Sequence, residues 1–491
     1  MKTQDDHIRR TYFMENTENK RARSSVAMDL TEGQPMKLII RFAVPLLLGI
    51  LLQQFYSLVD SLIVGRYVGR EALAGVGSTG SVNFIVLGLC MGVCNGFSVL
   101  IAQRFGARDY SGLRKAIANS IWLCVFIGVT VTVVVVALCK QILIWMNTPD
   151  TIFHFAYVYI VIIFAGIPMI ILYNFSAGVL RALGDSKSPI IFLAVAAVLN
   201  IGLDLILIVY FHMGTEGAAI ATVVSQGISG IMCVIYIKKR FPLLAYEPGE
   251  KRPDRDLMKL LLGIGLPMGL QYSITGIGSV ILQTSVNGLG DSAIAAIAAA
   301  LKVHILLSCP LDGLGQAMAP FAGQNVGAKK IDRISQGLKS AVICGFCVCA
   351  ILIVIVFFIG RGAVSLFLDR ENLSPEIVTE IIEYGNKYLI ITAFFDVMLA
   401  LVNIVRFTIQ GMGFSGFAMF AGLLEMIARI LAGVFLVPWL GFTGACLASP
   451  LAWIFADSFL VPAFFHCRKK LMKAADGQFS SKCDSSQQTD I

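Results

Sequence analysis

Charged residues are scarce in this chain of 491 residues. Aspartate, glutamate, lysine and arginine make up only 14% of it, whereas 57% of its residues are hydrophobic, and the mean hydropathy is +0.78. Soluble domains carry about 25% charged residues, so this chain has too few charges to cover the surface of a water-soluble fold of its size. That shortage excludes a cytosolic enzyme, a secreted domain, a nucleic-acid-binding protein and a disordered protein.

Three further signals are missing. Outer-membrane barrels alternate polar and apolar residues over strands of roughly 10 residues, and the sequence lacks that pattern. The phosphate-binding motif Gly-x-x-x-x-Gly-Lys-[Ser/Thr] does not occur, so the energy for any transport would come from an ion gradient. Cys344-Gly-Phe-Cys347 has metal-like spacing without nearby histidine or acidic partners, and we interpret the 12 cysteines as packing residues. Without a metal cluster or a serine–histidine arrangement, we expect no enzyme.

What the chain has in abundance is long apolar runs. A helix rising about 1.5 Å per residue crosses roughly 30 Å of hydrocarbon in about 20 residues, and strands are implausible because backbone groups in lipid need internal partners. The sequence therefore predicts an all-α polytopic membrane protein with twelve transmembrane helices, at residues 38–64, 73–103, 116–139, 152–182, 188–211, 215–237, 257–284, 292–323, 336–359, 377–410, 415–437 and 441–465.

Lysine and arginine are distributed unevenly between the two sides of the membrane. The segments on one side hold only Arg66, Arg70, Lys140, Arg361 and Arg370. Because basic residues accumulate in cytoplasmic loops, both termini are predicted to be cytoplasmic. The predicted organisation is a cytosolic N-terminal tail (1–36), an N-lobe of six helices (37–237), a cytosolic linker (238–256), a C-lobe of six helices (257–465) and a cytosolic C-terminal tail (466–491).

The two halves of the chain resemble each other. Five features recur 221 to 227 residues apart, namely Pro45 and Pro267, Gly69 and Gly290, Gln103-x-x-Gly106-Ala107 and Gln324-x-x-Gly327-Ala328, Arg181 and Arg406, and Gly217-Ala218 and Gly444-Ala445. Five matches in register indicate a duplicated six-span unit. Because six is even, both units enter the membrane in the same direction, and such parallel repeats leave a seam where a solute can bind near the midplane.

Ionisable side chains inside the spans are candidates for function, because burying them is costly unless they are paired or hydrated. Asp60 shares a helical face with Gln53 and Tyr56, and Asp204 follows Asn200 by one turn. Asp60 is either a hydrogen-bonded structural carboxylate or one that binds a proton or a cation. If the spans converge, their oxygen atoms suit a proton or a small hard cation, and the candidate site comprises Asp60, Asn200, Asp204 and Thr222.

The acidic site is not duplicated in the second half. In the register set by the two matched arginines, Glu425 and Arg429 stand where the first half has Asn200 and Asp204. Glu425 and Arg429 are four residues apart, which predicts a structural ion pair on one helix. Lys302, inside the eighth span, either extends toward the membrane surface or a partner, or has a gating or substrate role.

Several motifs spread over about residues 28–465 carry a family resemblance. They are Leu30-Thr31-Glu32-Gly33, Gln53-Gln54-x-Tyr56-x-x-Val59-Asp60, Val64-Gly65-Arg66-x-Val68-Gly69, Val99-Leu100-Ile101-Ala102-Gln103, Arg181-Ala182-x-Gly184-Asp185, Asn200-x-x-x-Asp204, Gly411-Met412-Gly413 and Glu425-x-x-x-Arg429. Together they closely resemble the bacterial multidrug and toxic compound extrusion (MATE) transporters.

The resemblance implies a twelve-helix, two-lobed antiporter that exports organic cations or amphipathic drugs in exchange for inward H⁺ or Na⁺. It places the coupling-ion site on Asp60, Asn200, Asp204 and Thr222. We assign the substrate cavity to Gln53, Tyr56, Gln271 and Asp396. One branch of the family uses acidic residues on the seventh and tenth helices of the other lobe. Here the corresponding residues are Gln271 and Asp396.

The resemblance also implies a monomer in the bacterial cell membrane, with no nucleic-acid partner and no cofactor beyond the coupling ion. A flippase for lipid or lipid-linked cargo is the alternative, because such proteins resemble this fold. They often carry fourteen helices and a basic cavity, however. The seam here is predicted to be acidic or neutral, which favours cationic cargo.

Overall fold

The described part of the chain is almost entirely helical. The computed structural model describes residues 28–368 and 374–486, and no strand occurs in them. Eleven helical segments in these ranges are long and apolar enough to cross a membrane, and a bent pair makes a twelfth if it forms one span. The predicted all-α polytopic membrane fold is confirmed.

Two predicted spans of the first half are each divided between two helices. Residues 73–103 include the separate short helix α3, and residues 152–182 form α6 and α7, which are bent by 49°. Pro168, in the first turn of α7, has no N–H group to continue the helix across Gly166. The elements are α2 (Pro35–Tyr67), α3 (Arg70–Ser78), α4 (Gly80–Gly106), α5 (Tyr110–Trp145), α6 (Asp150–Ala165), α7 (Ile167–Ala182), α8 (Lys187–Asp204), the π-helix η1 (Leu205–Tyr210) and α9 (Gly214–Arg240).

The second half repeats the order of long helices. Its last helix continues beyond residue 465, where the C-terminal tail was predicted to begin. The elements are α10 (Arg255–Val286), the short η3 (Asn287–Leu289), α11 (Asp291–Gly327), α12 (Ile331–Ser365), α13 (Pro375–Gly411), α14 (Ser415–Leu431), the π-helix η4 (Ala432–Leu436), α15 (Val437–Leu440) and α16 (Phe442–Ser486).

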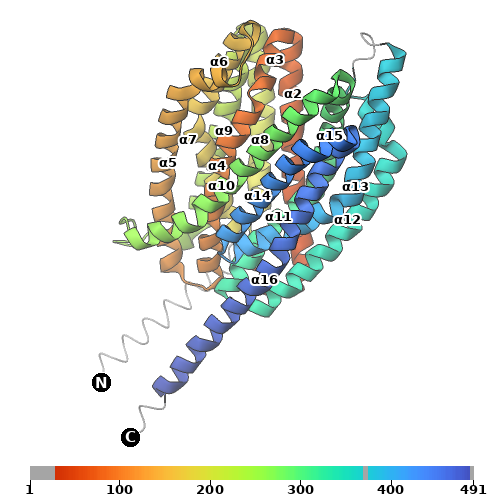
Figure 1. Ribbon diagram of the computed structural model, residues 1–491. Helices are drawn as coiled ribbons and strands as arrows, with labels where there is room; N and C mark the ends of the chain where they lie inside the picture. The colour runs from red at the N-terminus through yellow and green to blue at the C-terminus, as the bar shows by residue number, and fades with distance from the viewer. Residues whose placement is uncertain (1–27, 369–373, 487–491) are drawn as a thin grey trace.

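The two halves meet through equivalent helices. In Figure 1, α5, α6 and α7 lie on one side of the molecule and α12 and α13 on the other. Between them, α2 packs against α11, α10 packs against α4, and α4 packs against α11. Because α10 and α11 are the counterparts of α2 and α4, the first helix of each half packs on the second helix of the other. This arrangement is typical of parallel repeats about an axis along the membrane normal.

The segment before α2 joins both halves at one end of the bundle. The N–H of Leu30 donates to Oε1 of Gln324 at 2.9 Å, and the Leu30 carbonyl accepts from Nδ2 of Asn325 at 3.2 Å. The N–H of Met28 donates to the carbonyl of Gly184, in the first half, at 3.4 Å. We call this the basic end, because the lysine- and arginine-rich turns after α4 and α11 lie there.

The linker between the halves is fixed to α5. Arg114 is buried, and its Nε and Nη2 donate to the two carboxylate oxygens of Glu250 at 2.6 and 2.9 Å. Burial alone would raise the pKa of Glu250. Hydrogen bonds from Arg114, the Glu247 N–H and Ser111 outweigh that effect and hold the pKa below its ordinary value of 4.5. The linker is therefore anchored to the first half.

Glycines allow α4 and α10 to approach closely. A Cβ atom on Gly96 would lie 2.4 Å from the Cα of Gly265, and one on Gly92 would lie 2.6 Å from the Cα of Gly269. Small residues at helix crossings let backbones pack directly in a membrane. The contact between the halves is therefore a tight backbone-to-backbone crossing at these four glycines.

Gly265→Ala is expected to destabilise the protein by about 1–3 kcal/mol, because overpacking forces backbone shifts. A Cβ there would lie 2.7 Å from Cε1 of Phe97. Gly263→Ala, on the same helix, is the matched control, since its Cβ would meet nothing within 4 Å. Thermal unfolding in detergent compares the two. Equal unfolding temperatures for both variants would show that the crossing is not tightly packed.

Candidate functional site

Two buried carboxyl groups face each other inside the first half. Asp60 comes from the later part of α2, and Asp204 is the last residue of α8. Both side chains are buried, and the two carboxyl groups lie within hydrogen-bonding range of each other. The structure thus brings together the two aspartates that the sequence analysis selected.

No described donor satisfies most of their oxygen atoms. Both oxygens of Asp204 and Oδ1 of Asp60 are buried without a hydrogen-bond partner. No lysine, arginine or histidine in the described ranges forms an ion pair with either residue. Adjacent carboxylates in such surroundings cannot both be ionised without a cation. A proton shared between them, or a bound cation, satisfies the pair.

The backbone changes its geometry directly after Asp204. Residues Leu205–Tyr210 form a π-helix, and the α-helix ends at Asp204. π-Helical turns shift the register of the side chains that follow and are frequent at functional sites. Sequence periodicity at 3.6 residues per turn cannot reveal this break, so the predicted continuous span 188–211 missed it.

Asn200 and Thr222 complete an oxygen-rich group beside the aspartates. Nδ2 of Asn200 donates to Oγ1 of Thr222 at 3.5 Å, and Oδ1 of Asn200 is buried without a partner. A small cavity of about 10 Å³ adjoins them, which is about the space of one water-sized sphere. Oxygen atoms without donors are the ligands that hard cations prefer. The four residues can therefore hold a proton or a small cation.

Tyr56 and Gln53 lie on the same helix as Asp60 but differ in environment. The hydroxyl of Tyr56 accepts from Nε2 of Gln226 at 3.4 Å and borders the small cavity beside Asn200. The side chain of Gln53 is exposed. Tyr56 thus belongs to the interior of the first half. Gln226, which is not among the predicted site residues, bonds to the Tyr56 hydroxyl, and Gln53 also interacts with that hydroxyl.

In the second half, Gln271 and Asp396 are buried with polar partners of that same half. Oε1 of Gln271 accepts from Nε2 of Gln410 at 3.1 Å. Oδ1 of Asp396 is hydrogen-bonded to Nε2 of His304 at 2.9 Å. The His304 ring stacks on Trp453, with ring centres 6.1 Å apart. Neither Gln271 nor Asp396 lines the cavity between the halves that is described below.

Glu425 has a second partner besides the predicted Arg429, and this second partner is closer. Its carboxylate contacts Nη2 of Arg406 on α13, and it lies 3.8 Å from Nη2 of Arg429 on its own helix. Asp457, on α16, is buried close enough to interact electrostatically with Arg406. The predicted pair within α14 is therefore part of a four-residue charge cluster. Spacing along one helix could not indicate the residues from α13 and α16.

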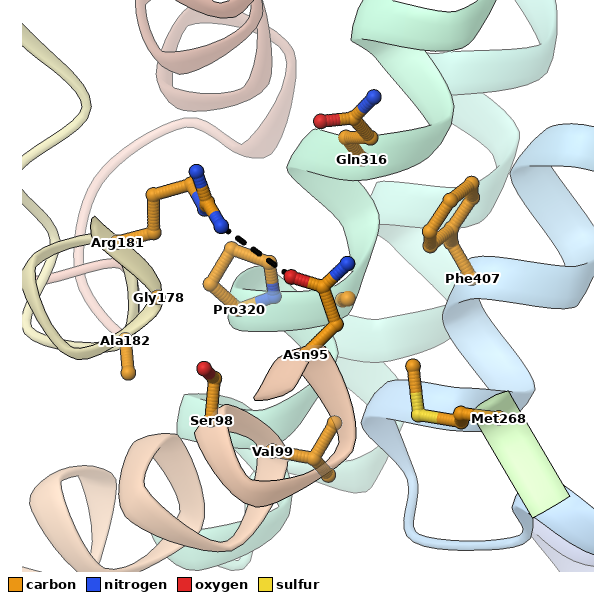
Figure 2. A pocket seen from close by; sticks show the side chains of 11 residues that line it. Asn95, Ser98, Val99, Gly178, Arg181, Ala182, Met268, Gln316, Pro320 and Phe407 are labelled. Carbon is orange, nitrogen blue, oxygen red and sulfur yellow. Dashed lines mark hydrogen bonds between the residues drawn. The ribbon is translucent and has the colours of Figure 1, made fainter. Parts of the chain in front are cut away.

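A cavity of about 40 Å³ lies between the halves. Arg181 of α7 and Asn95 of α4 line it from the first half, and Met268, Gln316 and Phe407 line it from the second. Nη2 of Arg181 donates to Oδ1 of Asn95 at 3.2 Å, and Figure 2 shows these groups pointing toward each other. The predicted acidic or neutral character of the seam is therefore wrong at this depth, because the position of Arg181 at the end of a span does not indicate that its side chain lines the cavity.

The duplicated Gln-x-x-Gly motif closes the seam at the basic end. Nε2 of Gln103 donates to the carbonyl of Gly411, the last residue of α13, at 3.1 Å. Nε2 of Gln324 donates to the carbonyl of Ala182, the last residue of α7, at 2.9 Å. Each glutamine thus caps a helix of the other half. The glycine of each motif allows the approach, because a Cβ on Gly106 would lie 2.0 Å from the Gln324 carbonyl oxygen.

Comparisons with known proteins agree with this architecture. The MatE family model matches residues 45–206 and 267–435, one segment in each half. The probable multidrug resistance protein YoeA of Bacillus subtilis is 29% identical over 379 residues, which are 76% of this chain and 80% of that protein. The probable multidrug resistance protein YpnP of the same organism is 28% identical over 452 residues, 91% of this chain and 98% of that protein.

A solved structure has the same fold. It is described as the outward-facing conformation of a multidrug resistance MATE family transporter of the MOP superfamily. It superposes with a TM-score of 0.83 and 23% identity, and the match covers 92% of this chain and 99% of that one. This similarity confirms the predicted architecture of twelve helices in two lobes.

The variant Gln103→Ala/Gln324→Ala is expected to open the basic end. Each lost hydrogen bond is worth about 1 kcal/mol, so the ratio of open to closed molecules should rise more than about tenfold. Distances between spin labels at Lys115 and Gln336, measured by pulsed electron paramagnetic resonance, report the opening. Gln283→Ala is the control, because Nε2 of Gln283 donates to Asn287, the residue directly after its own helix, and not to the other half. An unchanged distance distribution in the double variant would contradict this role.

Proposed function

The chain belongs to the MatE family, and we propose that it is an exporter of amphipathic drugs driven by inward movement of H⁺ or Na⁺. The proposal places it in the bacterial cell membrane, where it alternates between an opening on the basic end and an opening on the opposite end. Its relatives YoeA and YpnP are described as probable multidrug resistance proteins, which supports drugs as cargo over lipid or lipid-linked cargo.

One observation carries the proposal of ion coupling. The carboxyl groups of Asp60 and Asp204 face each other with three buried oxygen atoms that lack any described donor. A structural carboxylate is normally hydrogen-bonded or paired when it is buried. An orphaned pair is therefore better explained by a ligand that comes and goes, and the ligand that fits oxygen atoms alone is a cation or a proton.

The position of Asp60 links this ligand to the opening of the seam. α2 packs against α8, which carries Asp204, and it also packs against α11 of the other half. When the cation leaves, the two carboxylates repel each other and α2 can shift on α8. Any shift of α2 changes its contact with α11. The cation favours one conformation only to the extent that it binds the two conformations with different affinity.

The second half supplies the scaffold rather than a second acidic pair of this kind. Gln271 is neutral, Asp396 is bonded to His304, and Glu425 is bonded to arginine. Each of these three groups has a partner. The oxygens of Asp457 also lack a hydrogen-bond donor, but this carboxylate lies near Arg406 rather than beside a second carboxylate. We therefore assign ion coupling to the first half.

Asp60→Asn is expected to reduce drug export at least tenfold, because an amide pairs with Asp204 without a proton or cation. Ethidium efflux from proteoliposomes, with pH and Na⁺ gradients imposed separately, measures the rate and identifies the coupling ion. Asp150→Asn, an exposed carboxylate in the first turn of α6, is the matched control and should export at the wild-type rate.

Export by the Asp60→Asn protein at the wild-type rate, under the same gradient, would contradict ion coupling at this pair. Export that does not respond to either gradient in the wild type would contradict the antiport mechanism as a whole.

A further inference from the structure

Arg181 is a half-buried guanidinium that has no counter-charge among the described residues. It stands in the last turn of α7 and lines the cavity between the halves (Figure 2). Its one hydrogen bond to a described side chain is to Asn95, a neutral amide. No carboxylate of the described residues lies within ion-pair distance of it.

The equivalent arginine of the second half has a carboxylate partner that Arg181 does not have. Its counterpart in the second half, Arg406, contacts the carboxylate of Glu425. In the same register the first half has Asn200 in place of Glu425, and Asn200 is bonded to Thr222 instead. The arginine is thus present in both halves, whereas its acidic partner is present only in the second.

The nearest acidic residue along the chain is already engaged. Oδ1 of Asp185 accepts the N–H groups of Lys187 and Ser188 at 3.1 and 3.0 Å. Its Oδ2 accepts the hydroxyl of Ser188 at 2.6 Å. Asp185 therefore caps the start of α8 and does not neutralise Arg181.

A guanidinium has five N–H donors in a planar fork, which matches the two oxygens of a carboxylate or of a phosphate group. One of the five in Arg181 is used by Asn95. The cavity volume of about 40 Å³ is enough for one small group and not for a whole drug. Apolar side chains from the other half, Met268 and Phe407, complete the lining.

We propose that Arg181 binds an oxyanion of the cargo, so that this transporter exports amphiphiles that carry a carboxylate or a phosphate-type group, including zwitterions. The anionic group takes the place that Glu425 takes beside Arg406, and the apolar body of the cargo extends along the seam. This inference rests on the proposed export function, and it narrows the class of cargo beyond simple organic cations.

The test uses two dyes that differ only at the carboxyl group. Rhodamine 110 carries a free carboxylate, and rhodamine 123 is its methyl ester. Binding to the purified wild-type protein, followed by fluorescence anisotropy, should favour rhodamine 110 by about tenfold, because a charge-assisted hydrogen bond is lost in the ester. Arg181→Gln should remove that preference, and Arg181→Lys should retain most of it. Thermal unfolding verifies that both variants are folded.

Equal affinity of the wild type for the two dyes would overturn the proposal, even if no variant folds. So would an Arg181→Gln protein that loses affinity for both dyes equally. A transport assay tests the proposed export function separately. If proteoliposomes export neither dye under any gradient, the export function is refuted. If they export rhodamine 123 under a gradient but show no preference for the carboxylate, only the assignment of Arg181 fails.

Discussion

Two buried carboxyl groups, Asp60 and Asp204, face each other in the first half, and three of their oxygen atoms have no described donor. Water satisfies such groups at a surface, and an arginine or lysine satisfies them in most protein interiors. Here no arginine or lysine of the described residues pairs with them. We therefore propose that a proton or a cation neutralises the pair. Because α2 carries one of the two and also packs on the other half, occupation of the pair and the geometry of the seam are physically linked.

The two halves share a scaffold but differ in how their polar side chains are paired. Both halves keep the Gln-x-x-Gly motif, which closes the basic end by capping a helix of the opposite half. Both also keep an arginine at equivalent positions. In the second half that arginine is held in a cluster with Glu425 and Arg429, whereas in the first half it lines the cavity between the lobes. The ligands are therefore assigned to the first half, where two carboxyl groups face each other and the arginine has no carboxylate partner among the described residues.

Much of the fold could be predicted because lipid imposes strict constraints on a chain. Long apolar runs, matched positions such as Pro45 and Pro267, and the spacing of Asn200 and Asp204 were enough to predict the helices, the repeat and the aspartates. Contacts between helices far apart in sequence could not be predicted. The bond of Asp396 to His304, the contact of Arg406 with Glu425 and the π-helix after Asp204 all depend on packing in three dimensions. The charge of the seam was wrong for the same reason.

The most direct measurement of the central claim is infrared difference spectroscopy of the purified protein while the proton or Na⁺ concentration is stepped. We expect a carboxyl signal to appear or vanish with the cation in the wild type, and to be absent from a variant in which Asp60 and Asp204 are both asparagine. An identical difference spectrum from the wild type and that double variant would contradict the claim, because the responding carboxyl group would then lie elsewhere.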